Sequence, residues 1–134
     1  MKTSNFQFTN PRIVETIFIS NPQINPNNGA EYKIEVNCKV GQGEINNNTT
    51  DVKLTIILNE SENYMKEHDK PFYSKVSVIA SFSWTNNLSE NEIKRFLNIN
   101  APALLLSYIR PQIMYNSTQA GFPAYNLPFM NFAD

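Results

Sequence analysis

Hydrophobic and polar residues alternate along three segments in the middle of the chain. The alternation covers residues 32–40, 52–58 and 72–84, and only Ile57 and Ile79 break it. Because successive side chains of a strand point to opposite faces, a period of two predicts strands with one face in a core. The connections between the three segments are short, which favours antiparallel pairing.

A less regular apolar segment, residues 6–20, comes before these three and predicts a first strand. Asn10-Pro11 interrupts it, and a proline inside a strand indicates an edge position or a bulge. The consecutive residues Ile17, Phe18 and Ile19 would be apolar on both faces of the sheet. We therefore expect this strand to be covered on both sides or to expose an apolar stripe.

The chain from residue 86 onward has helical rather than alternating periodicity. Ser89 and Glu92 form a capping-box pattern, which predicts the start of a short helical connector. A long helix is predicted next, with Asn100 as its candidate N-cap and Gly121, followed by Pro123, at its C-terminal end. Its apolar residues recur at helical spacing at Leu104, Leu105, Tyr108, Ile109 and Ile113.

The last apolar segment, residues 122–132, cannot be helical throughout because Pro123 and Pro128 interrupt it. We expect it to lie extended across neighbouring elements, and we call it the strap. Its side chains are predicted to form one wall of a groove for extended apolar segments of other proteins, since exposed apolar surface marks interaction sites. The other wall is expected from the first two strands. The predicted groove residues are Ile17, Ile19, Ile24, Phe122, Tyr125, Leu127, Phe129 and Met130.

Strands come first along the chain and helices last, which predicts an α+β domain of two layers. The chain has no internal repeat and no linker, so we expect residues 1–134 to form a single domain. One long helix over one sheet would leave the far side of the helix exposed, and symmetric association is the usual way to bury such a surface. The predicted oligomer interface is Leu104, Leu105, Tyr108, Ile109, Gln112 and Ile113.

Composition and charge narrow the class of function. The 134 residues include 11 basic and 12 acidic ones, interspersed, with a net charge of −1, so no charge field favours nucleic acid or a membrane surface as the partner. The single cysteine, Cys38, excludes an internal disulfide and is typical of a reducing compartment. The N-terminal residues lack the apolar core of a signal peptide, and no apolar run is long enough to span a membrane. We expect a soluble, cytoplasmic protein.

Candidate catalytic residues are few. His68 is the only histidine, and it has only carboxylates beside it in the sequence, whereas a catalytic site needs several converging groups. Cys38 lies on the apolar face of its predicted strand, where it acts as a small hydrophobic residue. One thiol and one imidazole are too few ligands for a metal site. We therefore expect no enzymatic activity, no metal and no cofactor.

The C-terminal run APALLLSYIRPQIMYNSTQAGFPAYNLPFMNF, residues 101–132, resembles the SecB family of export chaperones. The resemblance runs without a gap through Pro102, Tyr108, Arg110, Ile113, Phe122-Pro123, Asn126-Leu127 and Asn131-Phe132. It implies a four-stranded antiparallel sheet in the order 1-4-3-2, with one long helix packed on one face. It also implies an ATP-independent holdase that binds unfolded apolar segments of preproteins for export, and a homotetramer built as a dimer of dimers.

Two features depart from the family pattern. Export members carry acidic residues on the exposed face of strands one and four, where the translocation motor docks, whereas the matching positions here are Ile17, about Asn21, and Lys75. The given chain also ends two residues past the match, so we expect it to lack the family's terminal helix and acidic tail and to have a more open groove. The resemblance therefore implies client holding, whereas the acidic positions for motor docking are absent.

Two other functions remain open on the sequence. One is a SecB-like chaperone dedicated to a single partner, such as the antitoxin of a toxin–antitoxin system, which the absent acidic positions favour. The other is a scaffold or subunit that uses the same domain for one fixed protein interface. The expected partners are unfolded or partly folded client proteins, with the export motor or an antitoxin as further partners, and without nucleic acid or membrane insertion.

Overall fold

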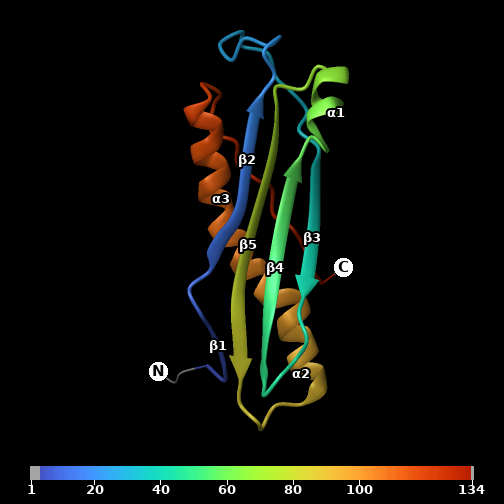
Figure 1. Cartoon of the computed structure of the whole chain (residues 1–134), viewed down its shortest axis with the longest axis vertical. Helices are drawn as coiled ribbons and strands as arrows, with labels where there is room; N and C mark the ends of the chain where they lie inside the picture. The colour runs from blue at the N-terminus through green and yellow to red at the C-terminus, as the bar shows by residue number, and fades with distance from the viewer. Residues whose placement is uncertain (1–3, 134) are drawn as a thin grey trace.

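The computed structural model describes residues 4–133, so the outermost residues of the predicted 1–134 domain lie outside it. Strands of this part of the chain form one antiparallel sheet in the order β1-β5-β4-β3, and β2 also pairs with β5 (Figure 1). The strands are β1 (Phe6–Phe8), β2 (Arg12–Ser20), β3 (Val36–Gln42), β4 (Thr49–Leu58) and β5 (Phe72–Trp84).

The first predicted strand is present but divided in two. β1 and β2 both pair with β5 and are separated at Asn10-Pro11, the position where the proline predicted an interruption. The register shifts again between Ile13 and Glu15, which places a bulge at Val14. Counting β1 and β2 as one edge strand, the sheet has the predicted order 1-4-3-2. The predicted α+β fold is confirmed.

The inner face of the sheet, which faces the long helix, carries the core. Alternate residues of β5 from Phe72 to Trp84 are all buried, and so are Val52, Leu54, Ile56 and Leu58 on β4. The four residues of β4 are completely enclosed. At about 1.5–3 kcal/mol for each fully buried large aliphatic side chain, this face is the main source of stability.

β3 starts later than the alternation predicts. The pattern begins at Tyr32, but the strand begins at Val36. Asn59 ends the ladder there: its N–H donates to the carbonyl of Glu35 (2.8 Å), and its side-chain Oδ1 accepts the N–H of Glu35 (3.1 Å). Asn59 is fully buried with φ of 62°, so this turn directs residues 32–35 away from the ladder.

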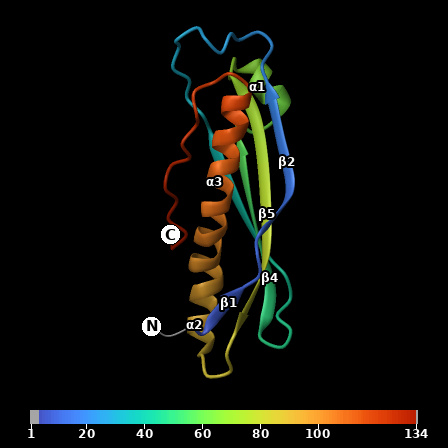
Figure 2. The ribbon, with the colours of Figure 1, turned by 90° about the vertical axis from the view of Figure 1, so that its left-hand side faces the viewer.

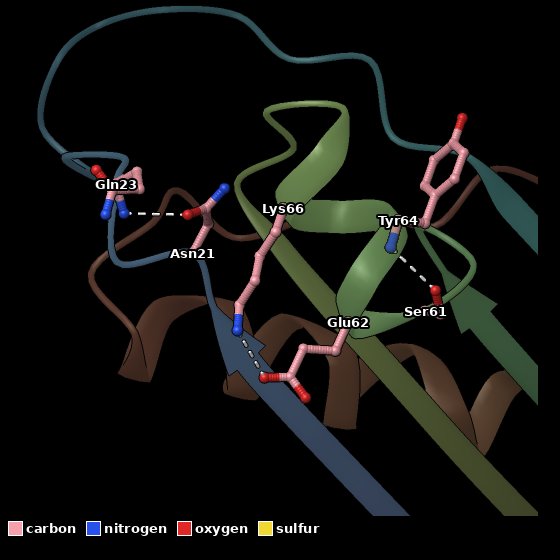
Figure 3. Close-up of polar contacts among 6 residues, drawn as sticks. All are labelled: Asn21, Gln23, Ser61, Glu62, Tyr64 and Lys66. Carbon is pink, nitrogen blue, oxygen red and sulfur yellow. Dashed lines mark hydrogen bonds and ion pairs between the residues drawn. The ribbon is translucent and has the colours of Figure 1, made fainter.

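A short helix, α1 (Glu62–Glu67), lies in the connection between the second and third alternating segments, where no helix was predicted. The side chain of Ser61 accepts the N–H of Tyr64 and caps the helix, and Lys66 pairs with Glu62 at 3.2 Å (Figure 3). Only Met65 of this helix is buried, which explains why hydrophobic periodicity did not reveal it.

The C-terminal helices follow one another without a break and form one continuous helical segment. α2 (Glu90–Arg95) begins with the predicted capping box of Ser89 and Glu92, and passes through a π-helical turn, η1 (Phe96–Asn100), into α3 (Ala101–Gln119). The prediction of Asn100 as an N-cap is therefore wrong, because Asn100 has helical torsion angles and makes no capping bond. The π-turn shifts the hydrogen-bond pattern just before Pro102, whose nitrogen has no hydrogen to donate.

The long helix packs against the inner face of the sheet (Figure 2). Leu105, Ile109 and Ile113 point into the core and are almost completely buried. Within the described residues, no helix is long and apolar enough to cross a membrane.

Candidate functional site

The strap begins where α3 ends, at a turn that suits glycine. Gly121 has φ of 88°, a conformation that L side chains rarely adopt. Its N–H donates to the carbonyl of Thr118 (3.0 Å), and the N–H of Phe122 donates to the carbonyl of Ser117 (3.1 Å). These two bonds form a Schellman motif, so the predicted helix end at Gly121 is correct.

The first half of the strap belongs to the core of the protomer. The buried hydroxyl of Ser117 accepts the N–H of Tyr125 (3.0 Å), which holds the strap back against α3. Phe122 and Tyr125 pack on the ring of Phe72, and Leu127 is 1% exposed. Phe122 and Leu127 were predicted to line the groove, but they are too deeply buried to contact a partner.

The second half of the strap lies at the surface between α3 and β3 (Figures 1 and 2). Phe129 is 95% exposed, and its ring lies over the guanidinium of Arg110, with 5.2 Å from Cζ to the ring centroid. Met130 and Phe132 point the other way and are partly buried against the core. The strap is therefore anchored in the core at its start and lies at the surface towards its end.

A groove of about 360 Å³ lies between the end of the strap and the edge strand β3. Its walls are Val36 and Cys38 on β3 and Pro128, Met130, Asn131 and Phe132 on the strap. We call it the strap groove. Burial raises the pKa of the Cys38 thiol, so at neutral pH this side chain is an uncharged part of an apolar wall. The groove is suited to apolar side chains rather than to charged ones.

The strap groove lies beside an open sheet edge. β3 pairs with β4 along its whole length, and among the described residues no strand pairs with its other side. An edge strand offers main-chain donors and acceptors to an added extended segment. The groove and the edge together can bind both the side chains and the backbone of one extended segment.

The prediction for the other wall of the groove is wrong in part. The second predicted strand does contribute, through Val36 and Cys38, but Ile17 and Ile19 lie on the outer face of the sheet. They pair with Lys75 and Tyr73, whose side chains point away from α3. The irregular alternation of the first strand could not decide which face these isoleucines occupy. Ile24 packs against the core in the loop after β2 and does not line the groove.

The three positions that match the family's motor-docking face do not form one exposed acidic surface. Ile17 lies directly beside Lys75, which pairs with Glu15 at 2.8 Å, and this pairing raises the pKa of Lys75. Asn21 is buried: its side-chain nitrogen donates to the carbonyl of Lys70, and its Oδ1 accepts the N–H of Gln23 (Figure 3). Asn21 therefore has a structural role in the turn after β2.

The residues predicted for the oligomer interface divide between two sides of α3. Leu105, Ile109 and Ile113 are in the core of the protomer, which corrects their assignment to a surface between protomers. Leu104, Tyr108 and Gln112 remain on the accessible side. The prediction missed Tyr115, which is exposed and lies seven residues after Tyr108, so it extends the same stripe. We call Leu104, Tyr108, Gln112 and Tyr115 the helix stripe.

The groups with possible chemistry are not arranged as a catalytic site in the described part of the chain. His68 is exposed and stacks on Tyr64, with 3.8 Å between the ring centroids. A hydrogen bond with Glu35 raises the pKa of Tyr64 to about 12, so this phenol stays protonated at neutral pH. Among the described residues, no three acidic, histidine or cysteine side chains gather as metal ligands.

The described residues thus bring an apolar groove and an open sheet edge together on one α+β domain. A family model described as "Preprotein translocase subunit SecB" matches residues 13–134. The chain therefore belongs to the SecB family of protein-export chaperones.

The chain is also similar to one relative in sequence and to one solved structure in fold. A protein-export protein SecB of Neorickettsia sennetsu is 26% identical over 106 residues, which cover 75% of this chain and 64% of that protein. The match thus spans less than two thirds of the relative's length. The fold is similar to a SecB-like chaperone of Mycobacterium tuberculosis, solved in complex with a peptide from an antitoxin. That structure has a TM-score of 0.69 and 11% identity, covering 95% of this chain and 88% of that one.

Proposed function

We propose that this protein is an ATP-independent holdase that binds unfolded apolar segments of other proteins in the strap groove. The observation that carries the proposal is the position of an apolar groove directly beside the free edge of β3. Apolar pockets select side chains, and a free edge binds backbone of any sequence, so the combination suits many unfolded clients. Met130 adds to this because methionine adapts its packing to different side chains. Such a chaperone would act in the cytoplasm, before export, without a cofactor.

The experiment is suppression of aggregation. A reduced, slow-folding secreted protein is diluted from denaturant with and without a stoichiometric amount of this protein, and light scattering is followed without ATP. We expect scattering to fall in proportion to the amount of chaperone. Unchanged scattering across a tenfold excess would contradict the proposal.

A second candidate function is a chaperone dedicated to one partner. It is favoured by the outer face of the sheet, where Ile17 and the paired Lys75 stand at positions that are acidic in export members. The similar chaperone of Mycobacterium tuberculosis, which binds an antitoxin peptide, gives a precedent for such a role. Affinity capture of the native protein distinguishes the two functions: many unfolded preproteins support the general holdase, and one folded or partly folded partner supports the dedicated chaperone.

We further propose that the protein assembles as a homotetramer, a dimer of dimers, through the helix stripe. Leu104, Tyr108 and Tyr115 recur at spacings of four and seven residues, which places them on one face of α3. This face borders the buried residues Leu105 and Ile109. Tyr108 and Tyr115 are exposed on it, and Leu104 is partly buried against the core. Symmetric association of two such helices would remove the stripe from water.

Light scattering of the purified protein should give a mass several times the 15.4 kDa of one chain. Replacing Tyr108 and Tyr115 with glutamate should lower this mass, because like charges would face each other across the symmetric contact. The double substitution should leave the circular dichroism spectrum unchanged, since both side chains are exposed. A monodisperse monomer of the unaltered protein at micromolar concentration would contradict the proposed assembly.

A further inference from the structure

A second apolar cavity, of about 310 Å³, lies at the end of the sheet farthest from α1. The turn between β3 and β4 contributes Ile45 and Asn48 to its wall, β5 contributes Trp84, and α2 contributes Glu90, Ile93 and Lys94. In Figure 1 these elements meet at the lower end of the molecule, where α2 approaches β4 and β5. We call this cavity the Trp84 pocket.

The indole N–H of Trp84 indicates what the pocket accepts. Trp84 is 7% exposed, and its Nε1 is buried without a hydrogen-bond partner among the described residues. Buried donors in folded proteins are nearly always paired, so an unpaired one beside a cavity points to an acceptor that a ligand supplies. The backbone N–H of Trp84 is already used, because it donates to the carbonyl of Asn48 (3.1 Å).

The charges around the pocket favour a neutral ligand. Glu90 and Lys94 lie one helical turn apart on α2, so the carboxylate and the ammonium compensate each other. The rest of the wall is Ile45, Ile93 and the indole ring. A ligand with one apolar group and an adjacent carbonyl oxygen fits both the wall and the unpaired donor, and each residue of a polypeptide with an apolar side chain has this structure.

Exposed residues of β3 and of the turn after it lie between this pocket and the strap groove, and two of them are apolar. Val40 lies on the same face of β3 as Val36 and Cys38, yet it is 46% exposed, and Ile45 beyond it is 50% exposed. Ile45 is nine residue steps after Val36, which corresponds to about 30 Å at roughly 3.3 Å per extended residue. A small molecule cannot contact both ends of this stretch, whereas an extended polypeptide can.

We propose that the Trp84 pocket is a second anchor for the extended segment bound in the strap groove. One apolar side chain of the segment fills the pocket, and a main-chain carbonyl of the segment accepts a hydrogen bond from Trp84 Nε1. This inference rests on the proposed holdase function. It adds a length requirement: a segment must extend about ten residues or more to reach both anchors, and it then binds more tightly than a shorter one with the same groove contacts.

Trp84 is the only tryptophan, so its indole N–H gives a single resonance that reports on this pocket. The probe is a synthetic peptide of about 12 residues, long enough for both anchors, with leucine at alternate positions and no tryptophan or cysteine. Fluorescence anisotropy of a labelled copy measures affinity, and ¹⁵N–¹H spectra of the full chain follow the indole signal. At saturation the indole resonance should move to higher proton frequency, as expected for a newly formed hydrogen bond.

The substitution that tests the pocket is Ile45→Ser, with Ile13→Ser as a matched control. Both isoleucines are about half exposed, but Ile13 lies on β2, away from the pocket. We expect Ile45→Ser to weaken peptide binding by about fivefold, the effect of losing part of one aliphatic contact, and Ile13→Ser to leave it unchanged. A leucine peptide of half the length should bind more weakly to the unaltered protein and be insensitive to Ile45→Ser.

The outcomes separate this inference from the function on which it rests. Binding that is weakened by Met130→Ser but not by Ile45→Ser, with an unmoved indole signal, supports the holdase and overturns the second anchor. A change in oligomeric mass on Ile45→Ser, with unchanged peptide affinity, also overturns it, because the pocket would then bind a second copy of the chain. Failure of the peptide to bind the unaltered protein overturns both proposals.

Discussion

Replacing Leu127 with alanine is expected to lower the free energy of unfolding by about 2–5 kcal/mol, the usual cost of truncating a fully buried leucine. Leu127 is 1% exposed and belongs to the same core cluster as Phe72 and Ile109, although it lies outside every helix and strand. The strap therefore contributes to the stability of the protomer. Urea unfolding, followed by circular dichroism, measures the change.

The neighbouring aromatic residue is the matched control for this substitution. Phe129 is larger than Leu127 but 95% exposed, so Phe129→Ala should change the unfolding free energy by less than about 1 kcal/mol. Loss of its contact with Arg110 adds little, because an exposed cation–π contact contributes only about 0.5–1 kcal/mol. Equally small effects at Leu127 and Phe129 would contradict the packing of Leu127 in the core.

Replacing Met130 with serine is expected to weaken binding of an unfolded client by about fivefold while the fold and the assembly persist. Met130 is partly buried and forms a wall of the strap groove. Losing about half of the 1.5–3 kcal/mol of a fully buried methionine corresponds to roughly this factor in affinity. Adding Phe129→Ser to the Met130→Ser substitution should weaken client binding further only if clients also contact the exposed side of the strap, where Phe129 lies. Anisotropy of a labelled unfolded protein gives the affinity.

Met114→Ser is the control for the Met130 substitution. Met114 is 37% exposed on α3 and is not part of the strap groove, so the same chemical change there should leave client affinity unaltered. Size-exclusion chromatography of both variants checks the assembly. Unchanged affinity in Met130→Ser would place the client elsewhere, and a smaller assembly would assign Met130 to a contact between protomers.

The elements whose pattern was regular were predicted well. The alternation of residues 72–84 gave the whole of β5, because one buried and one outer face leave a clear period of two. The capping box at Ser89 and Glu92 and the glycine at Gly121 marked helix ends correctly, since both depend on local bonds to the backbone. Asn10-Pro11 marked the break in the edge strand for the same reason.

The site was predicted less well, because it depends on which faces meet after folding. The apolar strap was identified, yet hydrophobicity alone could not separate Leu127, which is in the core, from Phe129, which is exposed. The face of Ile17 and Ile19 was decided by the bulge at Val14 and the pairing with β5. Within α3, Leu105 and Tyr108 looked alike in the periodicity, but only the packing on the sheet tells which one is buried.

The central claim is that unfolded apolar segments occupy the strap groove, and Cys38 allows it to be tested directly. Cys38 is the only cysteine and lines this groove. Because burial raises its thiol pKa, its reaction with a disulfide reagent at pH 8 should be slow and should accelerate as the pH rises. A control thiol can be placed on the opposite face of the same strand by combining Cys38→Ser with Lys39→Cys, since Lys39 points to the outer face.

The decisive measurement is the rate of this thiol reaction with and without a saturating cysteine-free leucine peptide. We expect the peptide to slow the reaction of Cys38 several-fold and to leave the control thiol unaffected. A Cys38 rate that is unchanged at peptide concentrations shown by anisotropy to saturate the protein would contradict the claim that clients bind in the strap groove.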